Sequence, residues 1–211
     1  MQVENIPVQN QRFSQIVPEQ LLNAAMQGDM QAHSELYRMF SQAIYTLAYG
    51  ICRSRECAED VLQNSFVQLI SKIGGFENRA PFGMWLRQIA VNEALMYLRK
   101  HKKHKATVNV DDMSFFDQQD NAFESVSMIS SHADFAAQQQ DHMDLEQMLA
   151  RLPDHVRTVV WLKEVEGYTH DEIAKLVDKS PSYSKSIVLR AYKFLRQKVA
   201  TPDLNSSLGA H

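Results

Sequence analysis

The sequence has few cysteines, glycines and prolines and no long apolar run, and each absence excludes a class of protein. Its 211 residues include two cysteines, seven glycines and six prolines. Two cysteines are too few for a disulfide scaffold or a four-ligand metal site, so we expect Cys52 and Cys57 to be ordinary thiols in a reducing cytoplasm. The longest apolar runs fall far short of the roughly 20 residues of a membrane-spanning helix. No secretory leader opens the chain, which favours a cytoplasmic protein without a membrane partner.

Basic residues are absent from one long stretch. Residues 106–150 carry nine acidic and no basic side chains, whereas residues 1–105 carry 12 basic and nine acidic, and residues 151–211 carry ten basic and seven acidic. The formal net charge of −3 therefore hides two mildly basic blocks on either side of an acidic one. Because binding to a polyanion depends on local surface charge, a nucleic-acid partner stays open.

The first block predicts helices throughout, because its apolar residues recur at steps of three and four. Asp29 and Ser54 are suited to cap two long helices. Gly74 ends the second of these, and Pro81 fits the first turn of a further helix. That helix runs into a basic segment at 99–105.

The second block predicts a helix-turn-helix. Thr169 and Glu172 form a capping box at the start of a short helix, and Ser180-Pro181 can cap and open the next one. The two helices are separated only by Asp178-Lys179. The second helix starts with polar side chains and continues with an apolar stripe, so its start could enter a major groove while the stripe anchors it. An ordinary helical hairpin with a solvated face is the alternative.

The predicted fold is therefore all-α, with two helical domains joined by an acidic flexible linker. The domains are expected at residues 19–105 and 141–200, and the linker at 106–140, because a long patternless stretch inside one domain is uncommon. Tails are expected at 1–18 and 201–211. The side chains expected on DNA from the helix-turn-helix at 169–190 are Ser182, Tyr183, Lys185, Ser186 and Arg190.

Three segments carry a family resemblance. The segments 57–66 (CAEDVLQNSF) and 82–92 (FGMWLRQIAVN) resemble region 2 of the extracytoplasmic-function class of bacterial RNA polymerase sigma factors, in the sigma-70 family. The segment from Leu152-Pro153 through Glu166-Gly167-Tyr168-Thr169 to Arg190-Ala191 is similar to region 4 of the same class. The resemblance implies that the chain directs core polymerase to specific promoters, with core enzyme and promoter DNA as partners and an anti-sigma factor as a further one.

The resemblance assigns roles to individual residues. The first domain would bind the largest polymerase subunits and recognise and melt the −10 element, while the second would recognise the −35 element. The residues expected to bind core are Asp60, Gln63, Asn64 and Phe66. The residues expected on −10 DNA are Phe76, Asn78, Arg79, Arg87, Gln88, Asn92, Arg99 and Lys100. Trp85, at helical spacing from Phe82 and Ile89, is assigned to the core.

The sequence departs from the family pattern where core binding is expected. Cys57 and Asn64 stand where the family usually has carboxylates, which makes this face less acidic. Phosphorylation of Ser65 would restore charge, so we state the hypothesis that a Ser/Thr kinase is a partner and Ser65 its site.

An enzyme is not expected. The sequence has no phosphate loop, no dinucleotide-binding glycine motif and no zinc-protease His-Glu pair, and no metal site or cofactor is predicted. The alternative to a sigma factor is a stand-alone helix-turn-helix transcriptional regulator with an N-terminal helical interaction domain.

Overall fold

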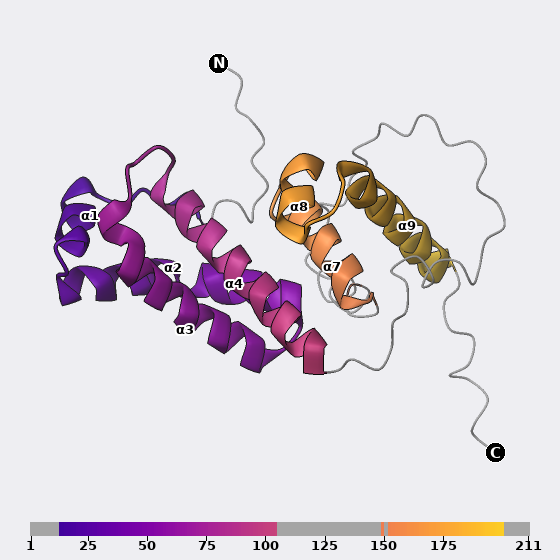
Figure 1. Ribbon diagram of the computed structural model, residues 1–211, viewed down its shortest axis with the longest axis horizontal. Helices are drawn as coiled ribbons and strands as arrows, with labels where there is room; N and C mark the ends of the chain where they lie inside the picture. The colour runs from indigo at the N-terminus through magenta and orange to yellow at the C-terminus, as the bar shows by residue number, and fades with distance from the viewer. Residues whose placement is uncertain (1–12, 105–148, 150–151, 201–211) are drawn as a thin grey trace.

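The computed structural model describes residues 13–104, 149 and 152–200, and all the regular elements among them are helical. The prediction of an all-α fold is confirmed. The linker predicted at 106–140 lies outside the described residues. Figure 1 shows the helices of the first domain on one side and those of the second domain on the other. The first domain contains α1 (Glu19–Met26), α2 (Met30–Cys52), α3 (Arg55–Lys72), the short η2 (Ile73–Gly75) and α4 (Phe82–His104), and the second contains α7 (Asp154–Val160), the π-helical η3 (Trp161–Val165), α8 (His170–Val177) and α9 (Pro181–Ala200).

The predicted helix starts are confirmed by their caps. The Asp29 carboxylate accepts from the backbone N–H of Gln31 at 2.7 Å, and the Ser54 hydroxyl accepts from that of Cys57 at 3.3 Å. Thr169 and Glu172 form the reciprocal capping box at the start of α8. Such caps satisfy the backbone donors of a first helical turn, so local sequence decides where these helices begin.

The core of the first domain is formed where α2 packs on α3 and α4. Its largest fully buried side chains include Leu36, Phe40, Ile44 and Leu47, all on one stripe of α2. They recur at three- and four-residue steps and so lie on a single face of the helix. This packing makes α2 the central helix of the domain.

The second domain is a compact helix-turn-helix. Ile173 and Ala174 of α8 are buried, as are Ile187 and Ala191 of α9. Asp178 takes the left-handed conformation (φ 55°) that ends α8 and turns the chain toward α9. Asp tolerates this conformation better than most residues, which explains how a turn without glycine is made here.

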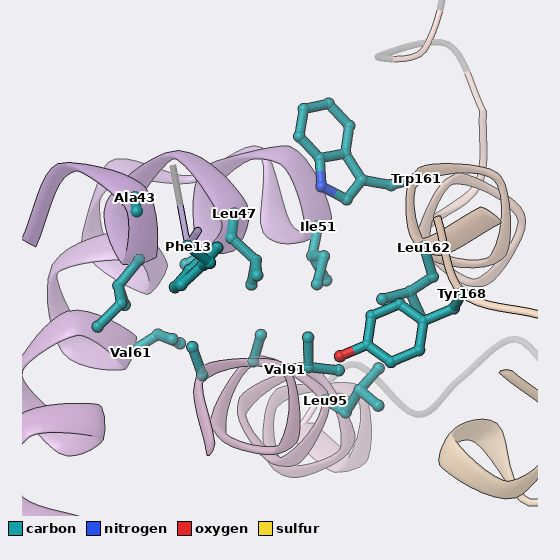
Figure 2. Packing of buried hydrophobic residues seen from close by; sticks show 14 of the residues in the cluster. Phe13, Ala43, Leu47, Ile51, Val61, Val91, Leu95, Trp161, Leu162 and Tyr168 are labelled. Carbon is teal, nitrogen blue, oxygen red and sulfur yellow. The ribbon is translucent and has the colours of Figure 1, made fainter. Parts of the chain in front are cut away.

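The two domains share one hydrophobic core. Leu162 and Tyr168 of the second domain belong to the same buried cluster as Ile51 of α2 and Val91 and Leu95 of α4. Figure 2 shows the Tyr168 ring and Leu162 directed toward these first-domain side chains. The second domain is therefore docked on the first rather than merely tethered to it.

The described helices include no candidate for a membrane span, since none of them combines the length with the hydropathy that a bilayer crossing needs.

Candidate functional site

The outer face of α3 is exposed to solvent and changes from polar to apolar along the helix. Asp60, Gln63 and Asn64 are all exposed near its middle. Val67 and Ile70 follow one and two turns later and are 63% and 51% exposed. These residues lie on one side of the helix, so polar and apolar groups form a continuous surface. The sequence prediction named the polar residues of this surface but not Val67 and Ile70.

Two predicted residues of α3 point away from that surface. Phe66 is only 8% exposed and packs on Tyr37, with ring centroids 4.7 Å apart. The structure therefore gives Phe66 a core role in place of the predicted contact with polymerase. Ser65 is fully buried, and its hydroxyl has no hydrogen-bond partner among the described residues. The Ser65 hydroxyl is therefore not accessible from solvent in this arrangement, and its phosphorylation stays a hypothesis that would require local opening of α3.

The loop between α3 and α4 carries three predicted −10 residues in two environments. Phe76 is 8% exposed and packs in an aromatic cluster, 5.4 Å from Phe82 and 5.1 Å from Trp85 between ring centroids. Phe76 therefore lies inside an aromatic cluster in this arrangement, and its contact with −10 DNA stays a prediction. Asn78 and Arg79 are exposed, with Asn78 in the left-handed conformation (φ 54°) and Arg79 paired with Glu77.

The predicted −10 residues of α4 divide between open surface and the domain boundary. Asn92 and Lys100 are exposed, and the Asn92 side-chain oxygen accepts from the Gln88 amide at 3.2 Å. Gln88 also accepts from the Tyr168 hydroxyl at 3.4 Å, and Arg99 donates to the backbone carbonyl of Leu176 at 2.8 Å. Gln88 and Arg99 are therefore engaged by the second domain.

Arg87 is buried at the same boundary. It is 7% exposed and donates to the backbone carbonyl of Glu166 at 2.6 Å, with the Glu166 carboxylate 3.9 Å away. Its guanidinium lies 4.4 Å from the centre of the Tyr168 ring. Burial raises the pKa of Tyr168 to about 12, against the opposing effect of Arg87. The Tyr168 hydroxyl is therefore neutral at physiological pH and can donate to Gln88.

A second buried arginine joins the end of α2 to α7. Arg157 is 3% exposed, and its Nε and Nη2 each donate to the Ile51 carbonyl at 3.2 Å. The same guanidinium donates to Leu152 O at 3.1 Å and to the Asp154 carboxylate at 2.7 Å. Sequence reasoning missed Arg157, because nothing local distinguishes a boundary arginine from a solvated one.

Close apolar packing completes the boundary. Gly50, in the last turn of α2, lies directly under Trp161, and a Cβ atom added at Gly50 would overlap the six-membered ring of Trp161. The Trp161 indole N–H donates to the Glu166 carboxylate at 3.3 Å. Trp161 is 8% exposed, so glycine is needed at position 50 for this approach.

The outer face of α9 is open. Ser182, Lys185 and Ser186 are exposed, and Leu189 beside them is 46% exposed. Lys185, Ser186, Leu189 and Arg190 line a shallow hollow on this helix. In Figure 1, α9 lies on the side of the second domain away from the first. The structure thus leaves most of the predicted −35 surface uncovered and adds Leu189 to it.

Two residues near the start of α9 have structural partners. Tyr183 is half-buried and lies under the Lys179 ammonium, 5.7 Å from its ring centre. Ser184 is fully buried and hydrogen-bonds His170 Nδ1 of α8 at 2.9 Å. Burial, followed by the neighbouring Lys163 and Lys185 charges, lowers the pKa of His170. His170 is therefore neutral at pH 7 and joins the two helices through Ser184.

Cys52 and Cys57 form a disulfide across the turn from α2 to α3, with Cα atoms 6.2 Å apart. The expectation of two ordinary thiols is therefore wrong. The sequence did not predict this pairing, because a spacing of five residues does not place two side chains on the same face of one helix. The chain instead changes direction at Arg53 and Ser54, between the end of α2 and the start of α3.

Comparison with protein families matches both domains. The model described as Sigma-70 region 2 matches residues 36–104, and the model described as Sigma-70, region 4 matches residues 142–195. The RNA polymerase sigma-H factor of Pseudomonas aeruginosa is 26% identical over 175 residues, covering 82% of this chain and 89% of the relative. The ECF RNA polymerase sigma factor SigM of Mycobacterium tuberculosis is 28% identical over 172 residues, covering 82% of this chain and 79% of the relative.

Two solved structures also match this chain in part. A structure of the sigma factor RpoE in complex with the anti-sigma factor NepR from Bartonella quintana matches with a TM-score of 0.49 and 21% identity, over 80% of this chain and 96% of that one. A structure of CnrH in complex with the cytosolic domain of CnrY matches with a TM-score of 0.48 and 18% identity, over 85% of this chain and 95% of that one.

Proposed function

This chain belongs to the extracytoplasmic-function class of the sigma-70 family, and we propose how its surfaces divide the work of directing core RNA polymerase to promoters. The family models match a region 2 domain and a region 4 domain in the order that the sequence predicted. The chain acts by binding, and we assign no catalytic step to it. A stand-alone regulator is not favoured, because such a protein has no need of a region 2 domain.

Core polymerase binds the outer face of α3 in this proposal. The observation that carries it is the exposure of Val67 and Ile70 beside Asp60 and Gln63. Exposed apolar side chains with a charged rim are typical of a protein interface. Asp60 and Gln63 supply directional contacts, while Val67 and Ile70 supply apolar area.

Promoter DNA is contacted by two separate surfaces. Asn78, Arg79, Asn92 and Lys100 are exposed and remain our candidates for the −10 element. The open face of α9 is the candidate for the −35 element, where Lys185 and Arg190 contact phosphates or base edges. Leu189 offers an apolar contact for a thymine methyl group.

The docked arrangement does not allow both surfaces to bind one promoter. The two elements are two to three duplex turns apart, or about 70–110 Å, whereas the domains share a buried boundary. The 35 residues at 106–140 can span at most about 115–125 Å when extended. Separation of the domains is therefore a required step, and the chain between them is long enough for it.

Reconstitution with core polymerase tests the proposal. We expect promoter-specific transcripts only when core and this chain are both present, with start sites that can be mapped. Asp60→Ala and Gln63→Ala should weaken core binding without changing promoter preference, while Lys185→Ala and Arg190→Ala should weaken binding to the −35 element without changing core affinity. Normal core affinity in both α3 variants would contradict the assignment, and a DNA footprint by the chain alone as a dimer would favour a regulator. An anti-sigma partner stays a prediction.

A further inference from the structure

The disulfide lies in the part of the first domain on which the second domain docks. Cys52 is the last residue of α2, and it directly follows Gly50 and Ile51. Gly50 receives the Trp161 ring, and the Ile51 carbonyl accepts two N–H groups of Arg157. Cys57 lies in the first turn of α3. The disulfide therefore ties the docking turn of α2 to the neighbouring helix.

We propose that Cys52 and Cys57 are a reversible thiol–disulfide site, and that its oxidation strengthens docking of the second domain. The reversibility rests on the proposed function, since a sigma factor works at the chromosome, in a compartment that keeps thiols reduced. Disulfides in such a compartment are usually transient and redox-sensing. The Cα separation of 6.2 Å in the closed pair lies in the range typical of protein disulfides.

The two cysteine residues differ in their access to solvent. Cys52 is partly exposed, whereas Cys57 is fully buried in the core of the first domain. A hydroperoxide therefore reaches Cys52 first, and Cys57 is the resolving residue.

The oxidation proceeds in two steps with a hydroperoxide as oxidant. The Cys52 thiolate attacks the O–O bond, which gives a sulfenic acid and releases the alcohol, or water when the oxidant is hydrogen peroxide. The Cys57 thiol then attacks the sulfenic sulfur, so that the S–S bond forms, the S–O bond breaks and water leaves. Two electrons pass from the sulfur pair to the peroxide. A small dithiol reverses the change by exchange.

The effect on docking follows from restricted motion. Docking requires the last turn of α2 to present the Gly50 surface and the Ile51 carbonyl in one geometry. A covalent tie to α3 reduces the freedom of that turn before docking, so less conformational entropy is lost on docking. Coupling between two sites typically changes an equilibrium by at least about fivefold, and we expect the ratio of docked to separated chains to be higher by that factor after oxidation.

Trp161 reports docking directly. It is 8% exposed in the docked arrangement and packs against Gly50 across the boundary. Trp161 is the only tryptophan left in a Trp85→Phe background, since the sequence contains two. Quenching of its fluorescence by acrylamide should be weak when the domains are docked and strong when they separate. Gly50→Ala, which removes the space for Trp161 without touching either cysteine, defines the separated state.

The experiment compares the full chain after treatment with dithiothreitol and with one equivalent of hydrogen peroxide. We expect peroxide to remove both free thiols with a mass loss of two hydrogens, and to lower the quenching constant of Trp161. Cys52→Ser and Cys57→Ala should show neither change, and Gly50→Ala should stay strongly quenched although its disulfide forms.

Three outcomes overturn the proposal. They are oxidation of Cys52 to sulfinic acid without a disulfide, equal quenching in the two redox states of the parent chain, and a peroxide response that persists in Cys52→Ser. None of these measurements involves polymerase or promoter, so their failure is distinct from failure of the proposed sigma function.

Discussion

The first domain has two faces that differ in what covers them. The outer face of α3 is uncovered and presents Val67 and Ile70 to solvent. The opposite situation holds at the end of α2 and along α4, where Arg87 is covered by the second domain. The chain therefore leaves its proposed polymerase surface open while it occupies part of its proposed −10 surface with its own second domain. Under the proposed function, we therefore infer that binding to core and exposure of the −10 surface are separate steps.

The covered face also differs in its chemistry. Arg157 and Arg87 are buried charges whose hydrogen-bond acceptors lie partly across the boundary, at Ile51 and Glu166. A buried charge that loses its partner is strongly unfavourable unless water replaces it. On separation of the domains both arginines become hydrated, so this boundary is suited to opening in a way that an all-apolar core is not.

Among the substitutions considered, charge reversal at Glu166 should have the largest effect, because it acts on the covered face and separates the domains. Glu166→Lys places a cation beside the buried Arg87 and removes the acceptor of the Trp161 indole. Breaking a buried pair typically destabilises by about 3–5 kcal/mol, so we expect the docked state to be lost. Acrylamide quenching of Trp161 measures the change. Glu19→Lys, an equal charge change on exposed α1, should leave the domains docked, and a docked Glu166→Lys chain would contradict this account of the boundary.

Disruption of the open face should have the next largest effect. Val67→Asp introduces a charge at the centre of the exposed apolar part of α3, and truncation or charging of a central interface residue can lower the binding free energy by about 2 kcal/mol or more. We expect core affinity to fall by at least tenfold, measured by competition against a labelled sigma chain, with the fold of the domain unchanged by circular dichroism. Gln31→Asp, at an exposed position in the first turn of α2, serves as the control. Undiminished affinity would show that polymerase binds elsewhere.

Substitutions on the exposed face of α9 should have a smaller effect, which is expected on DNA binding. Lys185→Ala is expected to weaken −35 binding uniformly across sequences and to reduce the salt slope by about 1 if Lys185 contacts a phosphate. Leu189→Ala should instead reduce discrimination at one base pair. The measurement is binding of labelled duplexes by the holoenzyme at several salt concentrations. Lys193→Ala, farther along the same helix, is the matched control, and equal losses in all three variants would argue against a specific reading face.

Acidification should destabilise the second domain. The pKa of His170 is lowered in the fold, so the unfolded chain binds more protons between that lowered value and the ordinary value of 6.5. Stability therefore falls as the pH drops below 6.5 and is fully present above it. The pKa of Glu172 is also lowered, chiefly by the Thr169 backbone N–H, and its contribution is lost only below about pH 4.5. Thermal unfolding followed between pH 7.5 and 5.5 should show a decrease that His170→Gln reduces.

Replacement of Ser65 should have the smallest effect. Its hydroxyl is fully buried without a partner among the described residues, so Ser65→Ala removes an unsatisfied polar group. We expect unfolding stability to be unchanged or raised by about 1 kcal/mol and reconstituted transcription to match the parent chain. If Ser65→Ala abolished transcription in cells and Ser65→Asp did not, the result would instead support phosphorylation at this position.

The local features of the fold could be predicted from the sequence, whereas contacts between distant segments could not. Asp29, Ser54 and Thr169 act through neighbours two or three residues away, so their caps follow from the sequence. The burial of Phe66 and Phe76 could not be read from the sequence, because an aromatic residue at a motif position has the same spacing whether it faces a partner or the core. The Arg157–Ile51 contact joins residues 106 positions apart, and no periodicity in the chain encodes it.

The separation of the two domains on an active promoter tests the central claim most directly. Dyes attached through non-natural residues at exposed positions 42 of α2 and 193 of α9 would report the distance between the domains by energy transfer. We predict efficient transfer in the free chain and a separation of about 70 Å or more, equal to two duplex turns, once core polymerase and a promoter are bound. Domains that remain docked in a complex that initiates transcription would contradict the account.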